Sequence, residues 1–162
     1  MLKNCGLSLL ELVAGLVILS ILFFFCLPLG LSIYRNNQVE IIKNEISAAV
    51  QFARTTAALR GLPLILTPLP QSSDWSAGMI LFVDNERHQY SEKTELIHQW
   101  QWNYQGIRIN WQGLYSKNYL LFAAEQKHAA ASGHFIIQHV QGKSLKITLN
   151  RLGRVRAAQP FS

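Results

Sequence analysis

Cysteine is scarce in this chain of 162 residues, and it is absent from the part in which a folded domain is expected. The two cysteines are Cys5 and Cys26, so no disulfide can form within residues 35–162. That part holds 128 residues (162 − 34), which is one domain of ordinary size with enough chain to bury an apolar core. Packing and hydrogen bonds, rather than disulfides, must therefore stabilise the domain.

The chain also lacks the short motifs that mark common active sites. It contains no Gly-x-Ser-x-Gly, no His-Glu-x-x-His and no phosphate-binding loop. Its five histidines show no ligand spacing with cysteine or acidic residues, so we expect no metal, no cofactor and no small-molecule substrate. We therefore expect that the protein is not an enzyme.

Charged residues are missing from Leu12 to Ile33, a run of 22 positions (33 − 12 + 1) that is long enough to cross a bilayer as a helix. Glu11 stands at the start of this run, where a carboxylate costs about 2.5–3.5 kcal/mol to insert. A signal peptide would explain the basic start at Lys3, and an ordinary anchor would explain the length. Neither explains Glu11, so we predict a transmembrane segment over residues 7–34 in which this acid has a function.

The residues around Glu11 carry a resemblance to a known family. Gly6 is followed by Leu7-Ser8-Leu9-Leu10-Glu11-Leu12, which resembles the class III leader of type IV pilins and type II secretion pseudopilins. The resemblance implies that residues 1–6 form a prepilin leader and that a prepilin peptidase cuts between Gly6 and Leu7 and methylates the new N-terminus. It also implies that Glu11 pairs with the α-amino group of a neighbouring pilin as the filament assembles.

Residues 35–162 are expected to fold as a helix followed by β-sheets. Apolar residues recur at steps of three or four between Val39 and Ala57, and Gly61 with Pro63 predicts that the helix ends at about residue 60. Pro63 and Pro68 predict that the first strand lies at a sheet edge. The fold class is α+β, with a long N-terminal transmembrane and amphipathic helix packed against antiparallel β-sheets. The predicted strands cover residues 62–67, 78–83, 95–102, 107–111, 119–123, 134–140 and 145–149.

Three further features narrow the resemblance to the FimT/GspH branch of minor pilins and pseudopilins, with a type IV pilin-like fold. They are Ala53-Arg54 with Ala57 late in the helix, the segment from Trp75 to Asp84, and the terminal Gly153-Arg154-Val155-Arg156. The resemblance implies a protein of the inner membrane with a single membrane pass, whose C-terminal domain lies in the periplasm before the protein joins other pilins in a type IV pilus.

Acidic residues are absent after Glu125, and residues 1–125 contain nine bases and nine acids. The whole net charge of +6 therefore lies near the C-terminus. A basic segment without acids attracts polyanions. Arginines two positions apart in an extended segment face the same side, so Arg154 and Arg156 are predicted to grip phosphates together, with Gly153 allowing a turn or close approach. The six cations are Lys127, Lys143, Lys146, Arg151, Arg154 and Arg156.

In FimT-like pilins the Gly-Arg-x-Arg pattern is associated with DNA binding in natural transformation, or competence. The resemblance therefore implies that the basic C-terminal tail, residues 143–162, binds double-stranded DNA without sequence specificity. Two alternatives remain open: a GspH-like pseudopilin of type II protein secretion, and a structural pilus-assembly pilin without DNA binding. In either case the basic tail would be a solvated surface or a contact for acidic lipid or a neighbouring pilin.

Overall fold

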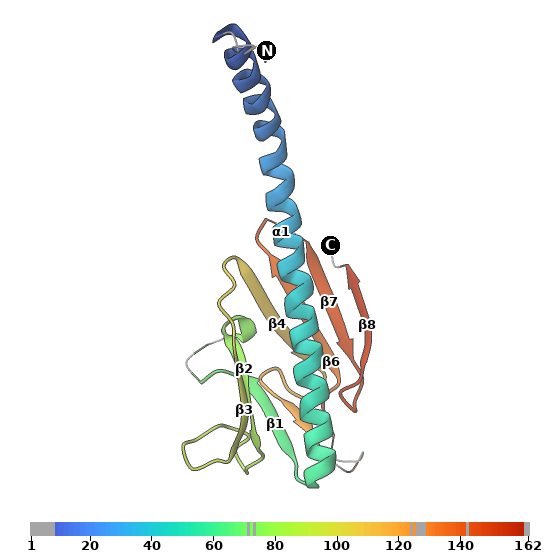
Figure 1. Ribbon diagram of the computed structural model, residues 1–162. Coiled ribbons are helices and arrows are strands. Elements are labelled where there is room, and N and C mark those ends of the chain that lie inside the picture. Colours follow the sequence, from blue (N-terminus) through green and yellow to red (C-terminus); the bar gives the residue numbers. More distant parts are fainter. Residues whose placement is uncertain are drawn as a thin grey trace, which may run out of the picture. The chain divides into compact units, whose positions relative to one another are not determined.

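Figure 1 shows the computed structural model, which describes residues 9–70, 72, 74–123, 125, 129–141 and 143–160, without the side chains at 25–29, 31, 32, 35 and 157. The chain divides into two compact units, Met1–Tyr34 and Arg35–Ser162. The predicted leader, residues 1–6, and the predicted cleavage junction between Gly6 and Leu7 lie outside the described residues. Lys127 also lies outside them.

In the first unit, the described residues belong to the beginning of helix α1 (Leu9–Arg60), whose first turn contains Glu11. Every described side chain from Leu9 to Phe24 is exposed. Within the part of the chain that the structure describes, no helix has the length and apolar character needed to cross a membrane. The transmembrane segment expected over residues 7–34 stays a prediction.

In the second unit, α1 packs through the apolar stripe that the sequence predicts. The stripe is completely buried, and its alanines let the helix approach the sheets closely. The helix ends where Gly61 adopts a φ of +67° and its N–H donates to the carbonyl of Ala57 at 3.0 Å, a glycine C-cap. The predicted helix end at about residue 60 is confirmed. The buried stripe consists of Val39, Ile42, Ile46, Ala49, Val50, Ala53 and Ala57.

Two antiparallel sheets of four strands lie against α1 in the second unit (Figure 1). Sheet A has the order β3-β2-β1-β5, and sheet B has the order β4-β6-β7-β8. The main core contains buried residues from α1 and from both sheets, so the predicted α+β fold is confirmed. The strand bounds are β1 Leu64–Pro68, β2 Gly78–Val83, β3 Leu96–Gln101, β4 Ile107–Gly113, β5 Leu120–Phe122, β6 Gly133–His139, β7 Ser144–Leu149 and β8 Val155–Pro160.

The prediction that β1 lies at an edge is wrong, because β1 pairs with both β2 and β5. Its prolines are tolerated for a local reason. Pro63 precedes the strand, and β5 pairs only with Leu64 to Leu66, so the last two residues of β1 have a strand on one side alone. At Pro68 the missing backbone N–H therefore costs no ladder hydrogen bond on the open side.

Within the segment predicted as a basic tail, residues 143–162, the strand predicted over residues 145–149 is confirmed as β7. Residues 144–149 form β7, and the chain then turns back to form β8, which pairs antiparallel with β7 at the edge of sheet B. The predicted strands stopped at residue 149, so β8 was missed. The arginines assigned to a tail are therefore carried by a β-hairpin.

The outer face of sheet A carries a second, smaller core. Ile65, Ile80 and Phe82 are buried there, and Tyr90 and Tyr119 from two loops pack against them. The loop between β2 and β3 thus folds back over the sheet. A short 3-10 helix, η1 (Trp75–Ala77), leads into β2 and is capped by the Asp74 carboxylate, which accepts from the N–H of Ser76 at 2.9 Å.

Candidate nucleic-acid interface

The β7–β8 hairpin is closed by a three-residue loop. The N–H of Asn150 donates to the carbonyl of Arg154 at 3.0 Å, and the N–H of Gly153 donates to the carbonyl of Asn150 at 2.9 Å. The side-chain oxygen of Asn150 also accepts from the N–H groups of Leu152 and Arg154. Gly153 has a φ of +69°, the left-handed conformation that ends this type of three-residue loop. These bonds hold Arg154 at the start of β8.

Gly153 is buried against the core of the protein. A Cβ atom at this position would lie 2.5 Å from Cε1 of Phe122, far inside van der Waals contact. The structure thus shows the turn that the sequence predicts for this glycine, and it packs the glycine against a ring of β5. Both the backbone conformation and the packing demand glycine here.

Arg154 of the hairpin and Arg54 of α1 line the same two hollows. A hollow of about 300 Å³ is lined by Arg154, Gly153 and Val155 from the hairpin and by residues of α1 that include Arg54. A neighbouring hollow of about 360 Å³ is also lined by both arginines. Arg54 and Arg154 therefore stand between two adjoining depressions. Within the described residues neither arginine forms an ion pair with an acid, so both charges are available to a ligand.

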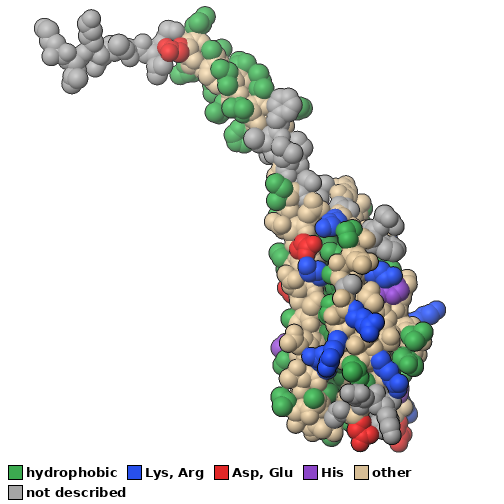
Figure 2. Space-filling view, turned by 90° about the vertical axis from the view of Figure 1, so that its right-hand side faces the viewer, with side chains coloured by type: hydrophobic (Ala, Val, Ile, Leu, Met, Phe, Trp, Pro, Cys, Tyr) green, Lys and Arg blue, Asp and Glu red, His purple; other side chains and the backbone are tan. Residues whose placement is uncertain are grey.

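The basic face extends beyond these two arginines. Figure 2 views the molecule from the side on which Figure 1 shows β8, and it shows several Lys and Arg side chains gathered there. Arg156 lies exposed on β8. Arg151 is exposed in the hairpin loop, where its Nε donates to the carbonyl of Ala129 at 3.0 Å and its guanidinium lies 5.9 Å from the ring centroid of Tyr115. Arg151 therefore also fixes the loop in place.

The two lysines assigned to the tail lie apart from the hairpin loop. Lys143 precedes β7, and its Nζ lies 3.6 Å from a carboxylate oxygen of Glu40 on α1. A hydrogen bond from Lys43 holds the pKa of Glu40 below its ordinary value against the effect of burial, and the charge of Lys143 adds to this lowering. The structure thus separates Lys143 from the arginines.

Lys146 lies on β7 directly opposite Ile136 of β6. Side chains alternate along a strand, so Lys146 shares the outer face of sheet B with His134. Burial lowers the pKa of His134, and the charge of Lys146 lowers it further. The strands of sheet B contain no Asp or Glu, so no acid within the sheet offsets these charges.

Sequence reasoning missed Arg54 as a site residue, although a signal for it exists. Ser47, Gln51 and Arg54 are spaced four and three residues apart and form a polar stripe beside the buried stripe of α1. All three line the hollow with Arg154. The segment that lies beside this stripe belongs to the β7–β8 hairpin, which the sequence did not predict. Only the structure could therefore show that Arg54 and Arg154 lie at the same hollow.

This fold is that of a type IV minor pilin. Two crystal structures of the minor pilin FimU from Pseudomonas aeruginosa strain PAO1 are similar to it. In space group P21 the TM-score is 0.57 at 16% identity, with 76% of this chain and 94% of that chain covered. In space group P65 the TM-score is 0.50 at 18% identity, with 72% and 89% covered. Among proteins with curated functions, none matches the sequence.

The sequence itself places the chain in a family. The sequence model of the family of the type II transport protein GspH matches residues 44–153, which is more than half of the chain. The protein therefore belongs to the GspH/FimT family of minor pilins and pseudopilins. Membership in a pilin family indicates association with other pilins in a filament or pseudopilus.

Proposed function

We propose that this minor pilin binds double-stranded DNA through the arginines around the β7–β8 hairpin, for DNA uptake in natural transformation. The observation that supports the proposal most directly is that Arg54 and Arg154 line the same two hollows without an acidic partner in the described residues. Guanidinium groups donate two parallel hydrogen bonds to a phosphate, and two of them around a concave surface suit neighbouring phosphate groups, one for each arginine.

Binding of this kind reads the backbone of DNA and not its bases. Arginine contacts with phosphates carry no sequence information, and the described hairpin presents no helix that would enter a major groove. We therefore expect affinity that is indifferent to sequence and that falls steeply with salt.

We further propose that the chain is processed and located as a pilin. Prepilin peptidase would remove residues 1–6 and methylate Leu7, and Glu11 would pair with the new N-terminus of a neighbouring subunit. The uncharged run from Leu12 to Ile33 would hold the protein in the inner membrane, with residues 35–162 in the periplasm, until the filament assembles. The motif around Gly6 and the family of the chain support this part of the proposal.

A second candidate function is a minor pseudopilin of type II protein secretion. It is favoured by one observation, because the family model that matches the chain is that of a type II transport protein. In that case the domain makes contacts with other proteins, and the arginines do not bind DNA. A structural pilus-assembly pilin makes the same prediction for DNA.

DNA binding at several salt concentrations separates these functions. The full chain in a neutral detergent is titrated with a short DNA duplex, alongside the variant Arg54→Gln/Arg154→Gln. We expect a log-log salt slope of about −0.9 for each phosphate contacted, and a slope reduced by about two contacts in the variant. The control is Arg87→Gln/Lys93→Gln, which removes the same charge from the β2–β3 loop. Equal losses in both variants, or no binding at low salt, would reject the DNA proposal.

A further inference from the structure

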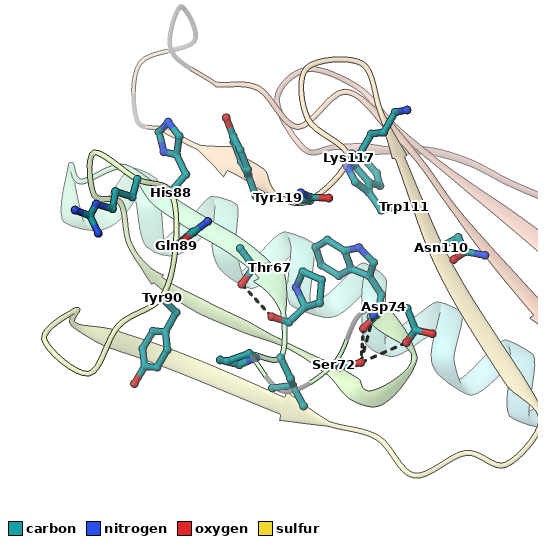
Figure 3. Close-up of a pocket in the computed structure, with 16 residues that line it drawn as sticks. Thr67, Ser72, Asp74, His88, Gln89, Tyr90, Asn110, Trp111, Lys117 and Tyr119 are labelled. Atoms are coloured by element: carbon teal, nitrogen blue, oxygen red, sulfur yellow. Dashed lines mark hydrogen bonds between the residues drawn. The ribbon is translucent and has the colours of Figure 1, made fainter.

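A second candidate site lies where loops of sheet A meet strand β4 of sheet B, and it shares no residue with the hollows at the hairpin. The cavity has a volume of about 600 Å³. As Figure 3 shows, it is lined by the end of β1 and the segment that follows it, by the β2–β3 loop, by β4 and by the β4–β5 loop. This volume lies within the range of roughly 300–1,000 Å³ that is typical of ligand pockets. From these elements we propose that the cavity binds a short, neutral oligosaccharide.

The first argument is the number of polar groups that have no partner. Gln89, Asn110 and Asn118 line the cavity with exposed side chains, and the amides of these side chains make no hydrogen bond within the described residues. The hydroxyl groups of Tyr90 and Tyr119 are likewise unbonded among these residues. Amide groups both donate and accept, as sugar hydroxyls do, so the two sets of groups are complementary.

The second argument is the balance of charge. Arg87 and Lys117 line the cavity, and the Asp74 carboxylate lines it as well. His88 also lines it and is paired with Asp84, with 2.7 Å between Nδ1 and the carboxylate oxygen. The hollows at the hairpin have two arginines and no acid, whereas the lining of this cavity holds one acid, Asp74, beside its two cations. A neutral ligand with many hydroxyl groups fits this lining better than a polyanion does.

The third argument is that the loops are already held in place. In the β2–β3 loop the Asn85 side chain accepts from the N–H groups of Arg87 and Gln89 and donates to the carbonyl of Gln89 at 2.7 Å. His88 has a φ of +52°, a conformation that non-glycine residues adopt only where the surroundings enforce it. Its ring lies against that of Tyr119, with 4.9 Å between centroids (Figure 3).

The β4–β5 loop on the other side of the cavity is fixed in a similar way. The indole N–H of Trp111 donates to the carbonyl of Ser116 at 2.9 Å. The Ser116 hydroxyl accepts from the N–H groups of Asn118 and Tyr119. Two loops fixed by their own side chains lower the cost of ordering on binding, which favours the weak individual contacts that a sugar makes.

The test is an NMR titration of the full chain with chitotetraose and with cellotetraose, in a detergent that has no sugar headgroup. We expect saturable shifts of the amide signals of the two loops. In the variant Gln89→Ala/Asn118→Ala the affinity should fall about tenfold, because two hydrogen-bonding groups are lost. The control Asn103→Ala/Gln105→Ala removes two exposed amides outside the cavity, and its affinity should stay within about twofold of the wild type.

Three results would overturn the proposal. They are the absence of saturable shifts with both sugars, equal affinity in the Gln89→Ala/Asn118→Ala variant, and the same loop shifts produced by inorganic phosphate or by a DNA duplex. The variant Tyr119→Phe, which keeps the ring and its packing, gives a second measure because it removes the hydroxyl alone. This proposal does not depend on DNA binding, so the Arg54→Gln/Arg154→Gln variant should keep its affinity for the sugar.

Discussion

Two regions of the same compact domain carry opposite charge. Residues 74–95, which include β2 and the β2–β3 loop, have two bases and five acids, a formal net charge of −3 (2 − 5). Residues 133–160, which form β6, β7 and β8, have five bases and no acid, a formal net charge of +5. Both regions contribute to the shared core, so the fold does not require this separation. The asymmetry gives the hairpin side alone a field that attracts polyanions.

The largest effect is expected from Gly153, which supports the basic region. The variant Gly153→Ala should lower the free energy of unfolding by about 3 kcal/mol, because it adds strain at a positive φ and a clash with Phe122. Chemical denaturation of the full chain measures this loss. The control is Gly106→Ala, where φ is +74° but the nearest atom to the new Cβ, on His139, lies at 3.7 Å. Its loss should be only about 1 kcal/mol, and equal losses would contradict the role of Phe122.

The next effect concerns the two arginines of the hollows. If both contact phosphates, Arg54→Gln and Arg154→Gln should each weaken DNA binding about fivefold at moderate salt and each reduce the salt slope by about 0.9. Fluorescence anisotropy of a labelled duplex measures both quantities. An effect of Arg154→Gln without any effect of Arg54→Gln would show that α1 does not contact DNA. The attraction of DNA would then belong to the basic residues 133–160 alone.

A smaller effect is expected from His134 on the outer face of sheet B. Its folded-state pKa lies below the ordinary value of 6.5, so protonation favours the unfolded chain. At pH values well above 6.5 His134 is neutral in both states and does not affect the free energy of unfolding. As the pH drops below 6.5, the free energy of unfolding should fall. The variant Lys146→Gln should raise the pKa of His134, which NMR titration of the ring signals measures. An unchanged pKa would rule out Lys146 as a cause.

The smallest effect is expected from Glu40, an acid beside the basic region. Its pKa is lowered from 4.5, so its ion pairs stabilise the fold above that pH and lose their effect as the pH falls through the lower folded-state value. The variant Glu40→Gln should lose this acid-range dependence and change stability little at neutral pH, because the Glu40 side chain is 40% exposed. Chemical denaturation at several pH values measures the free energy of unfolding of the variant and of the wild type. A large loss of this free energy in the variant at neutral pH would contradict this account.

The sequence predicted most of the fold but not the arrangement of the site. The buried stripe of α1 follows from helical periodicity, and β2 was predicted with the bounds observed. β8 was missed because Val155 is followed by arginine, two alanines and a glutamine, which have little strand character of their own. Its pairing with β7 depends on the turn at Gly153, and the sequence predicted either a turn or a close approach to a ligand at this glycine, without the pairing that the turn allows.

The site also depends on contacts between residues that are far apart in the sequence. Arg54 and Arg154 are 100 positions apart (154 − 54), and no local pattern relates them. The cavity between the sheets combines four separate segments, so it too could not be predicted from spacing. What local sequence does encode is the support of these sites, such as the Asn85 and Asn150 side chains that fix their loops.

The contact between Gly153 and Phe122 also determines how the hairpin responds to mechanical load. A free tail pulled through its arginines would simply extend. Here a pull on Arg154 acts on a loop whose glycine lies against a ring of the other sheet, and on a strand that is hydrogen-bonded along β7. Tension would therefore pass into both sheets at once, and the hairpin could be peeled away only by breaking its contact with the core.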